Sequence, residues 1–352
     1  METLLREMLE KFLVTHSPSG QEGEMDEAVR PYLERLCDDT WMDARGNLIG
    51  RIRGERPEGA LVIAAHKDEL GAIVERIEPD GRVRLDGTCG IQAWRYGEGP
   101  FDLIGDEIVT GVLSVGSTHV SARSADISAT KTNRPMDWEA ARVVTGLAPD
   151  ELRAKGVNVG SMAVVARSRK TPMWLGDRVC GYGLDDKGAV AAALLSAQVL
   201  RETAADRGGV PPSDVYFAIT AAEEIGCSGG RYVARTLPVE TMIAIEIAPV
   251  APEYEVTMSA APVLNYKDRF VYHKGLSDRL CAIGDDLGFG HQRSLFRTMG
   301  TDAGEAYRAG QIARAACVCF ATENTHGYEM AHFGAILNTG RMLGAYAANP
   351  KL

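Results

Sequence analysis

The sequence has no apolar run that approaches the ~18 consecutive residues a membrane-spanning helix requires. It also lacks a cluster of lysine and arginine residues, and its 38 basic side chains are outnumbered by 48 acidic ones, which gives a formal net charge of -10. A protein that binds nucleic acid needs a basic face for the phosphates. The composition therefore excludes a membrane span and disfavours a nucleic-acid partner, whereas acidic side chains suit a site for cations.

Two common catalytic signatures are absent: a Walker-type phosphate loop and a G-x-G-x-x-G that follows a strand. Cysteine is sparse, with seven residues, and Cys317 and Cys319 lie close together within an apolar run. Residues at this spacing share one face of a strand, so we interpret them as reduced core cysteines. The first residues mix charged side chains with leucines, which predicts an amphipathic helix rather than a signal peptide, and we expect a cytoplasmic location.

The order of apolar runs predicts an α/β fold with an insertion. Residues 1 to about 36 predict two helices around the turn Ser17-Pro18-Ser19-Gly20, and ALVIAA at 60–65 predicts a strand buried on both faces. From about 72 to 166, short alternating runs with glycines predict a β-rich unit with one helix near 149–155. Beyond it, strands alternate with helices, which indicates a sheet covered on both faces. We predict a discontinuous main domain, 1–71 and 167–352, and an inserted domain, 72–166.

Histidine or carboxylate side chains stand just beyond an apolar strand, or within one, at five places along the chain. These are His66 with Asp68, Asp185 with Asp186, Glu223 with Glu224, Glu246, and His326. In open α/β sheets such strand ends gather at one edge. Zinc and similar ions favour imidazole and carboxylate ligands, and a two-metal hydrolase needs two ligand sets with the ions ~3.5–4 Å apart. Two histidines and three carboxylates would supply both sets.

Each position also has an ordinary structural explanation. His66 could belong to a surface turn, Glu223 and Glu224 could form a solvated strand end, and Glu246 could pair with a buried cation. The functional explanation has Asp68 holding the second ring nitrogen of His66. In the same explanation, one of the adjacent Glu223 and Glu224 side chains binds a metal ion and the other acts as general base for the attacking water. Glu246 is the most informative carboxylate, because a buried unpaired charge costs several kcal/mol.

Taken in order, these motifs resemble the tetrahedral aminopeptidases, dinuclear metallo-aminopeptidases that include glutamyl and deblocking aminopeptidases. The motifs are Pro18-Ser19-Gly20, Gly46-Asn47-Leu48, Ala65-His66-Lys67-Asp68-Glu69-Leu70-Gly71, Leu184-Asp185-Asp186-Lys187, Glu223-Glu224-Ile225-Gly226, Gly300-Thr301-Asp302-Ala303, and His326 with Glu329. The resemblance covers nearly the whole chain. It implies a zinc-peptidase-like mixed α/β sheet flanked by helices, with a small inserted β-rich domain.

The resemblance also implies a set of metal ligands. In it, Asp185 bridges two ions, Glu224 and His326 complete one site, and His66 and Glu246 complete the other. The family usually has Asp where this chain has Glu246. Two divalent metal ions are therefore expected, with zinc as the first choice and cobalt or manganese as alternatives.

The remaining roles implied by the resemblance are those of Glu223, as general base, and Asp68, as the carboxylate behind His66. The predicted partners are peptide substrates and further copies of the chain, because the family assembles into large homo-oligomers through its inserted domain. No nucleic acid and no membrane are expected.

The predicted activity is removal of N-terminal residues from peptides, and two other enzyme classes remain as alternatives. An amidohydrolase or deacylase would use the same metals on N-acyl or other non-peptide amides. A glycosidase is disfavoured because its paired carboxylates need neither histidines nor metal. A catalytically silent homologue that acts in assembly or binding is disfavoured too, since the base and all ligands are present.

Overall fold

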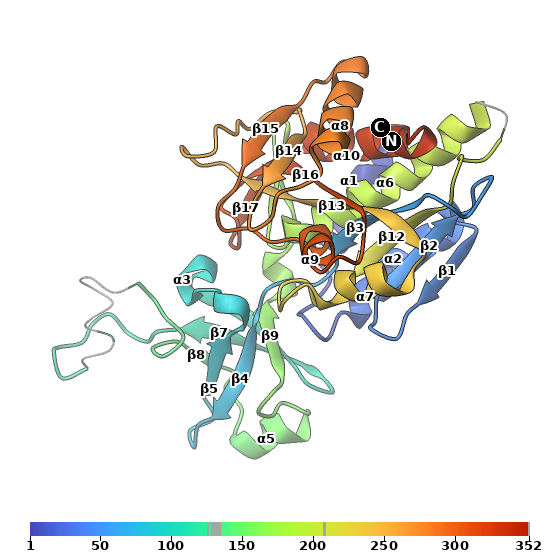
Figure 1. Cartoon of the computed structure of the whole chain (residues 1–352). Helices are drawn as coiled ribbons and strands as arrows, with labels where there is room; N and C mark the ends of the chain where they lie inside the picture. The colour runs from blue at the N-terminus through green and yellow to red at the C-terminus, as the bar shows by residue number, and fades with distance from the viewer. Residues whose placement is uncertain (125–126, 128–134, 207–208, 351–352) are drawn as a thin grey trace.

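The computed structural model describes residues 1–124, 127, 135–206 and 209–350 (Figure 1). The larger, mixed part contains α1 (Glu2–Phe12), α2 (Gly23–Leu36), β1 (Asp39–Met42), β2 (Leu48–Ile52), β3 (Ala60–His66), η2 (Arg167–Arg169), β10 (Met173–Leu175), β11 (Arg178–Gly181), α6 (Leu184–Asp206), β12 (Val215–Thr220), α7 (Ser228–Thr236), β13 (Val239–Pro249), β14 (Val263–Lys267), α8 (Lys274–Asp286), β15 (Gln292–Leu295), α9 (Asp302–Arg308), β16 (Arg314–Glu323), β17 (Glu329–His332) and α10 (Phe333–Ala348). The smaller part contains β4 (Ala72–Ile77), β5 (Val83–Gly87), η1 (Thr88–Gly90), α3 (Ala93–Tyr96), β6 (Gly99–Ile104), β7 (Ile108–Ser114), β8 (Arg142–Val144), α5 (Pro149–Ala154) and β9 (Met162–Val165).

The larger part is built on a mixed sheet in the order β1-β2-β12-β3-β13-β16-β17-β11-β10, with β14 and β15 branching from β16. At its centre β12, β3, β13 and β16 run parallel. These strands are apolar and buried along almost their whole length, as strands covered on both faces must be. Their carboxyl ends meet at one edge of the sheet, which is where the candidate site lies.

Helices cover both faces of this sheet (Figure 1). On one face a core cluster joins residues of α1, α2, α6, α8 and α10 to the strands, and on the other a second cluster includes residues of α7 and α9. Helix α6 is buried around nearly its whole circumference, because α10 and the sheet enclose it. The start of this helix, at Leu184 and Asp185, is thereby fixed against the sheet edge.

The smaller part is a closed barrel in the order β4-β5-β8-β7-β6-β9, with its own apolar core. Strand β7 illustrates how the barrel core forms. Its Val109 and Leu113 are buried and alternate with the exposed Ile108 and Val112, which is the pattern of a strand with one face toward the core. Figure 1 shows the barrel below the larger part, with α3 on the side that approaches it.

The predicted fold class is confirmed: a mixed α/β sheet flanked by helices carries an inserted β-barrel. The helix expected near 149–155 is α5. The division into domains at 71/72 and 166/167 stays a prediction. Among the helices of the described ranges, none combines the length and apolar character needed to cross a membrane.

Candidate metal centre

The parallel strands and α6 deliver the predicted side chains to one place. His66 is the last residue of β3, Glu246 lies within β13, Glu223 and Glu224 follow β12, His326 follows β16, and Asp185 stands in the first turn of α6. These six side chains line a common cavity of about 390 Å³. The sheet edge therefore brings together residues that are far apart in the sequence, since His66 and His326 are separated by 260 positions.

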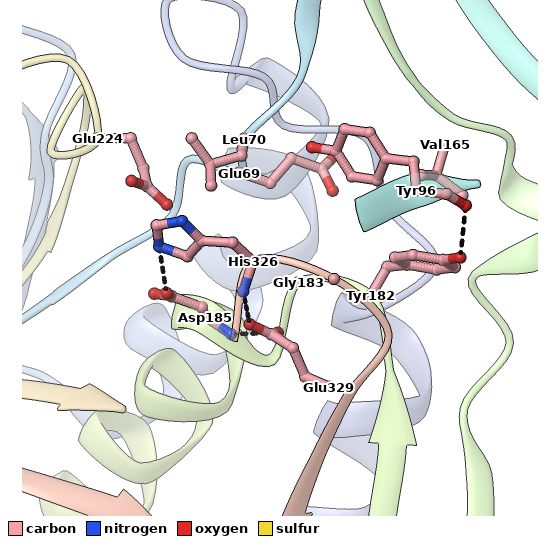
Figure 2. Close-up of a pocket in the computed structure, with 11 residues that line it drawn as sticks. Glu69, Leu70, Tyr96, Val165, Tyr182, Gly183, Asp185, Glu224, His326 and Glu329 are labelled. Carbon is pink, nitrogen blue, oxygen red and sulfur yellow. Dashed lines mark hydrogen bonds and ion pairs between the residues drawn. The ribbon is translucent and has the colours of Figure 1, made fainter. Parts of the chain in front are cut away.

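Asp185 lies between the two histidines. Its Oδ1 is 3.2 Å from His66 Nε2, and its Oδ2 is 3.4 Å from His326 Nε2. Figure 2 shows its carboxylate directly beside the His326 ring, with Glu224 on the other side of that ring. A carboxylate that turns one oxygen to each of two imidazoles has the shape required of a bridging ligand.

Two groups of potential metal ligands share Asp185. One comprises His66, Asp185, Asp186 and Glu246, the other comprises Asp185, Glu224 and His326, and within each the ligand atoms lie within 4.8 Å of one another. Asp186 Oδ1 and Glu224 Oε1 are buried without a hydrogen-bond partner among the described residues. Because an unpaired buried carboxylate oxygen is costly, these atoms fit a bound cation. The nitrogen and oxygen donors suit zinc, cobalt or manganese.

Asp68 connects the His66 ring to the Glu223–Glu224 loop. Its Oδ1 lies 3.5 Å from His66 Nδ1 and accepts a hydrogen bond from the Glu223 amide at 2.9 Å. Its Oδ2 accepts from the Glu224 amide at 3.2 Å and from the Ser19 hydroxyl at 2.6 Å. These bonds to the ionised form, together with His66, hold the pKa of Asp68 below its usual value although burial opposes this. His66 Nδ1 itself lies 3.0 Å from the Asp68 backbone carbonyl oxygen, so the carboxylate fixes the two glutamates and the backbone of the same residue holds the histidine.

Glu223 is buried beside this centre, with Oε2 3.9 Å from His66 Nε2. Burial raises the pKa of Glu223 to about 8, and the nearby Asp302 carboxylate adds to the effect. The Cys227 thiol donates to Glu223 Oε1 at 3.0 Å. The loop turns at Gly226, whose φ of +112° favours glycine. A carboxyl group with a raised pKa that faces the cavity has the properties of a general base.

The structure brings every predicted site residue to this edge, although their individual roles stay predictions. Asp186, which the sequence pattern already places beside Asp185, belongs to the His66 group, and the structure adds Asp302 and Cys227, which form a further group with Glu223. The sequence contained a signal for Asp302, because it lies in the Gly300-Thr301-Asp302-Ala303 motif. For Cys227 the sequence offered no indication of a role in the site, because a single cysteine after Gly226 is not part of any motif named above.

A sheet that presents two histidines and several carboxylates at its strand ends, beside an inserted barrel, is the architecture of a metallopeptidase. Residues 46–342 match the M42 glutamyl aminopeptidase family, and the chain belongs to that family. It is accordingly a metallo-aminopeptidase by class, a hydrolase of peptide bonds.

Three known proteins show how far the similarity extends. The chain is 24% identical to the lysyl aminopeptidase of Pyrococcus furiosus over 68% of this chain and 66% of that protein. Its fold superposes on aminopeptidase APDkam598 of Desulfurococcus kamchatkensis with a TM-score of 0.87 and 21% identity, over 99% of this chain and 95% of the other. The TET1 peptidase of Pyrococcus horikoshii gives a TM-score of 0.82 and 22% identity, over 98% and 99%. That peptidase assembles into a tetrahedron or a large octahedral shell.

Proposed function

We propose that the chain removes N-terminal residues from peptides at a centre of two divalent metal ions, with Glu223 as the general base. The observation that carries this proposal is the position of Asp185 between His66 and His326, one carboxylate oxygen toward each ring. Asp185 would be shared, with His66 and Glu246 completing one site and Glu224 and His326 the other. Zinc is the expected metal, with cobalt or manganese as alternatives.

When bound, the two ions supply a lower pKa for an attacking water and polarisation of the peptide carbonyl. The protein's own part falls to Glu223, which takes the proton from the water and returns it to the leaving amine nitrogen. Asp68 keeps both Glu223 and His66 in place through its bonds to the loop amide and its contact with the ring.

The proposal extends to the setting of the enzyme. The TET1 relative supports assembly into a large homo-oligomer. The cytoplasmic location inferred from the sequence belongs to the proposal as well.

The test is hydrolysis of aminoacyl-p-nitroanilides and unblocked peptides by the metal-loaded protein. We expect a chelator to abolish release of N-terminal residues and added zinc, cobalt or manganese to restore it. Glu223→Gln should bind the same amount of metal but lose activity by about a hundredfold or more, because a general base contributes at least that much. Glu323→Gln, at the partly buried end of β16 and outside both ligand groups, is the matched control.

Two results would count against the proposal. If Glu223→Gln loses metal together with activity, Glu223 is a ligand and not the base. If the metal-loaded protein cleaves N-acyl amino acids and leaves unblocked substrates intact, the enzyme is a deacylase.

A further inference from the structure

Cys227 holds Glu223 at two points. Its backbone amide donates a hydrogen bond to the Glu223 carbonyl oxygen at 2.7 Å, and its thiol donates to Glu223 Oε1 at 3.0 Å. Both side chains are buried, and both line the large cavity beside the candidate metal ligands. The two residues are four positions apart, so the loop between them is closed through the backbone and through the side chains.

The two carboxylate oxygens of Glu223 differ in their surroundings. Oε1 accepts the bond from the thiol, and within the described part of the chain no other group donates a hydrogen bond to this carboxylate. Oε2 lies 3.9 Å from His66 Nε2, on the side of the candidate metal ligands. The thiol therefore sets the rotation of the carboxylate, and it leaves the oxygen that faces the centre open to a water.

The backbone of Cys227 does not explain why a cysteine stands there. Its φ of +53° and ψ of +33° lie in the left-handed region, which glycine adopts freely and other residues adopt at a cost. A glycine at this position would suit the backbone better. Strain of this kind gathers at functional sites, where the side chain serves a purpose that offsets it. The contact with Glu223 is such a purpose.

The Cys227 thiol is suited to donate a hydrogen bond. Burial and the Glu223 carboxylate raise the pKa of Cys227 well above its ordinary value, so the thiol keeps its proton at neutral pH. A thiol is also an uncharged donor. It can orient the carboxylate without neutralising it, whereas a lysine or arginine at the same place would compete with the proton that a general base must accept.

We propose that Cys227 is a positioning residue for the general base: its thiol holds Glu223 Oε1, so that Oε2 is the oxygen that takes the proton from the attacking water. No bond to the sulfur forms or breaks in this step, and the proton passes from Oε2 to the leaving amine nitrogen. The inference rests on the proposed function, since the thiol has this task only if Glu223 is the base.

The test compares three metal-loaded variants with the wild type. Cys227→Ala removes the donor, and we expect kcat for aminoacyl-p-nitroanilides to fall about tenfold with KM and metal content unchanged, because a hydrogen bond to a charged group is lost. Cys227→Ser keeps a donor and should stay within about threefold of the wild-type kcat. Cys227→Gly should be as slow as Cys227→Ala but unfold at a higher temperature, because glycine relieves the backbone. If kcat follows the thermal midpoint across the three variants instead, the role of Cys227 is structural and the inference is wrong.

A second series tests whether the thiol acts through Glu223. In a Glu223→Gln background, Cys227→Ala should cause no further loss of kcat, because both changes affect the same step. The infrared S–H stretching band that Cys227→Ala removes should lie below that of an exposed thiol, and Glu223→Gln should raise its frequency. Cys281→Ala is the matched control: it removes a buried thiol 3.5 Å from the Tyr266 hydroxyl, outside the cavity, and kcat should not change.

The outcomes separate this inference from the proposed function. If Glu223→Gln loses activity while Cys227→Ala keeps the wild-type kcat, the inference is wrong and the proposed function stands. The same holds if Cys227→Ala slows the reaction equally with Glu223 and with Gln at that position. If the enzyme cleaves N-acyl amino acids and not unblocked peptides, the aminopeptidase proposal fails, and a tenfold loss in Cys227→Ala with recovery in Cys227→Ser on those substrates would still support the role of the thiol.

Discussion

Glu69 is buried between two lysines at the junction of the barrel and the larger part, and we predict that Glu69→Gln destabilises the protein. Glu69 Oε1 lies 2.6 Å from Lys170 Nζ, its Oε2 lies 3.3 Å from Lys187 Nζ, and its Oε1 also accepts from the Ser17 amide at 2.8 Å. Glutamine keeps the shape but not the charge. Both lysines would then be buried without a carboxylate.

The expected magnitude follows from the pKa of this carboxyl. Burial alone would raise the pKa of Glu69, but the two ammonium groups and the Ser17 amide lower it from 4.5 to about 2. A depression of that size corresponds to about 3 kcal/mol of folding free energy. Breaking a buried pair by removing one partner costs a similar amount. For 352 residues the unfolding entropy is about 0.7 kcal/mol/K, so the thermal midpoint should fall by roughly 4–5 °C if the chain unfolds as one unit.

The sign of the pH dependence is also fixed. Because the pKa of Glu69 is lower in the folded state, its contribution is complete above pH 4.5 and is lost as the pH falls toward about 2. The assay is the thermal midpoint of both proteins from neutral to acid pH, at one protein concentration. The gap between them should be widest near neutrality and close on acidification.

A matched control is Glu240→Gln, which breaks the ion pair with Arg314 Nη2 at 3.0 Å. The Glu240 side chain is 60% exposed, so this change should cost less than about 1 kcal/mol. A Glu69→Gln midpoint within 1 °C of the wild type, or a gap that does not shrink in acid, would refute the reasoning.

The two candidate ligand groups should respond separately to substitution, as stepwise metal titration against a chelating indicator can measure. Glu246→Asp shortens a candidate ligand of the His66 group by one methylene, and we expect the metal to bind about tenfold more weakly in one of the two steps of the titration. Unchanged or tighter metal binding would show that Glu246 is not a ligand in this geometry. Arg95→Ala removes the donor to the Thr325 carbonyl in the loop that carries His326, so the other step should weaken by about tenfold. If Arg95→Ala weakens both steps equally, the contact supports the fold in general and not the His326 group.

Local patterns predict the strand ends of the site well, because the physical cause is local. The run ALVIAA is apolar at every position, which requires cover on both faces, and His66 follows it at the point where β3 reaches the edge. Glu246 stands in a run of the same kind in β13. A charge in such a run needs a partner, and the parallel order of the strands puts the available partners at the same edge.

The same patterns cannot predict contacts made by the arrangement of the chain in space. His16 looks like a turn residue, yet it is buried, and its Nε2 lies 2.9 Å from Asp102, 86 positions away. Arg95 reaches Thr325 across 230 positions. Asp186 contributes to the centre although it is adjacent to Asp185, since the first turn of α6 departs from helical angles there. None of these contacts leaves a periodic trace in the sequence.

These long-range contacts make the barrel a structural part of the site. Asp102 of β6 contacts His16, His16 Nδ1 lies 2.9 Å from Lys170 Nζ, and Lys170 pairs with Glu69. Glu69 in turn pairs with Lys187 in the first turns of α6, the helix whose start supplies the shared carboxylate. Every link is buried, so the loss of one leaves its neighbours with fewer partners in a place that water reaches poorly. One chain of buried hydrogen bonds and ion pairs therefore connects the barrel, through Asp102, to the helix that carries Asp185.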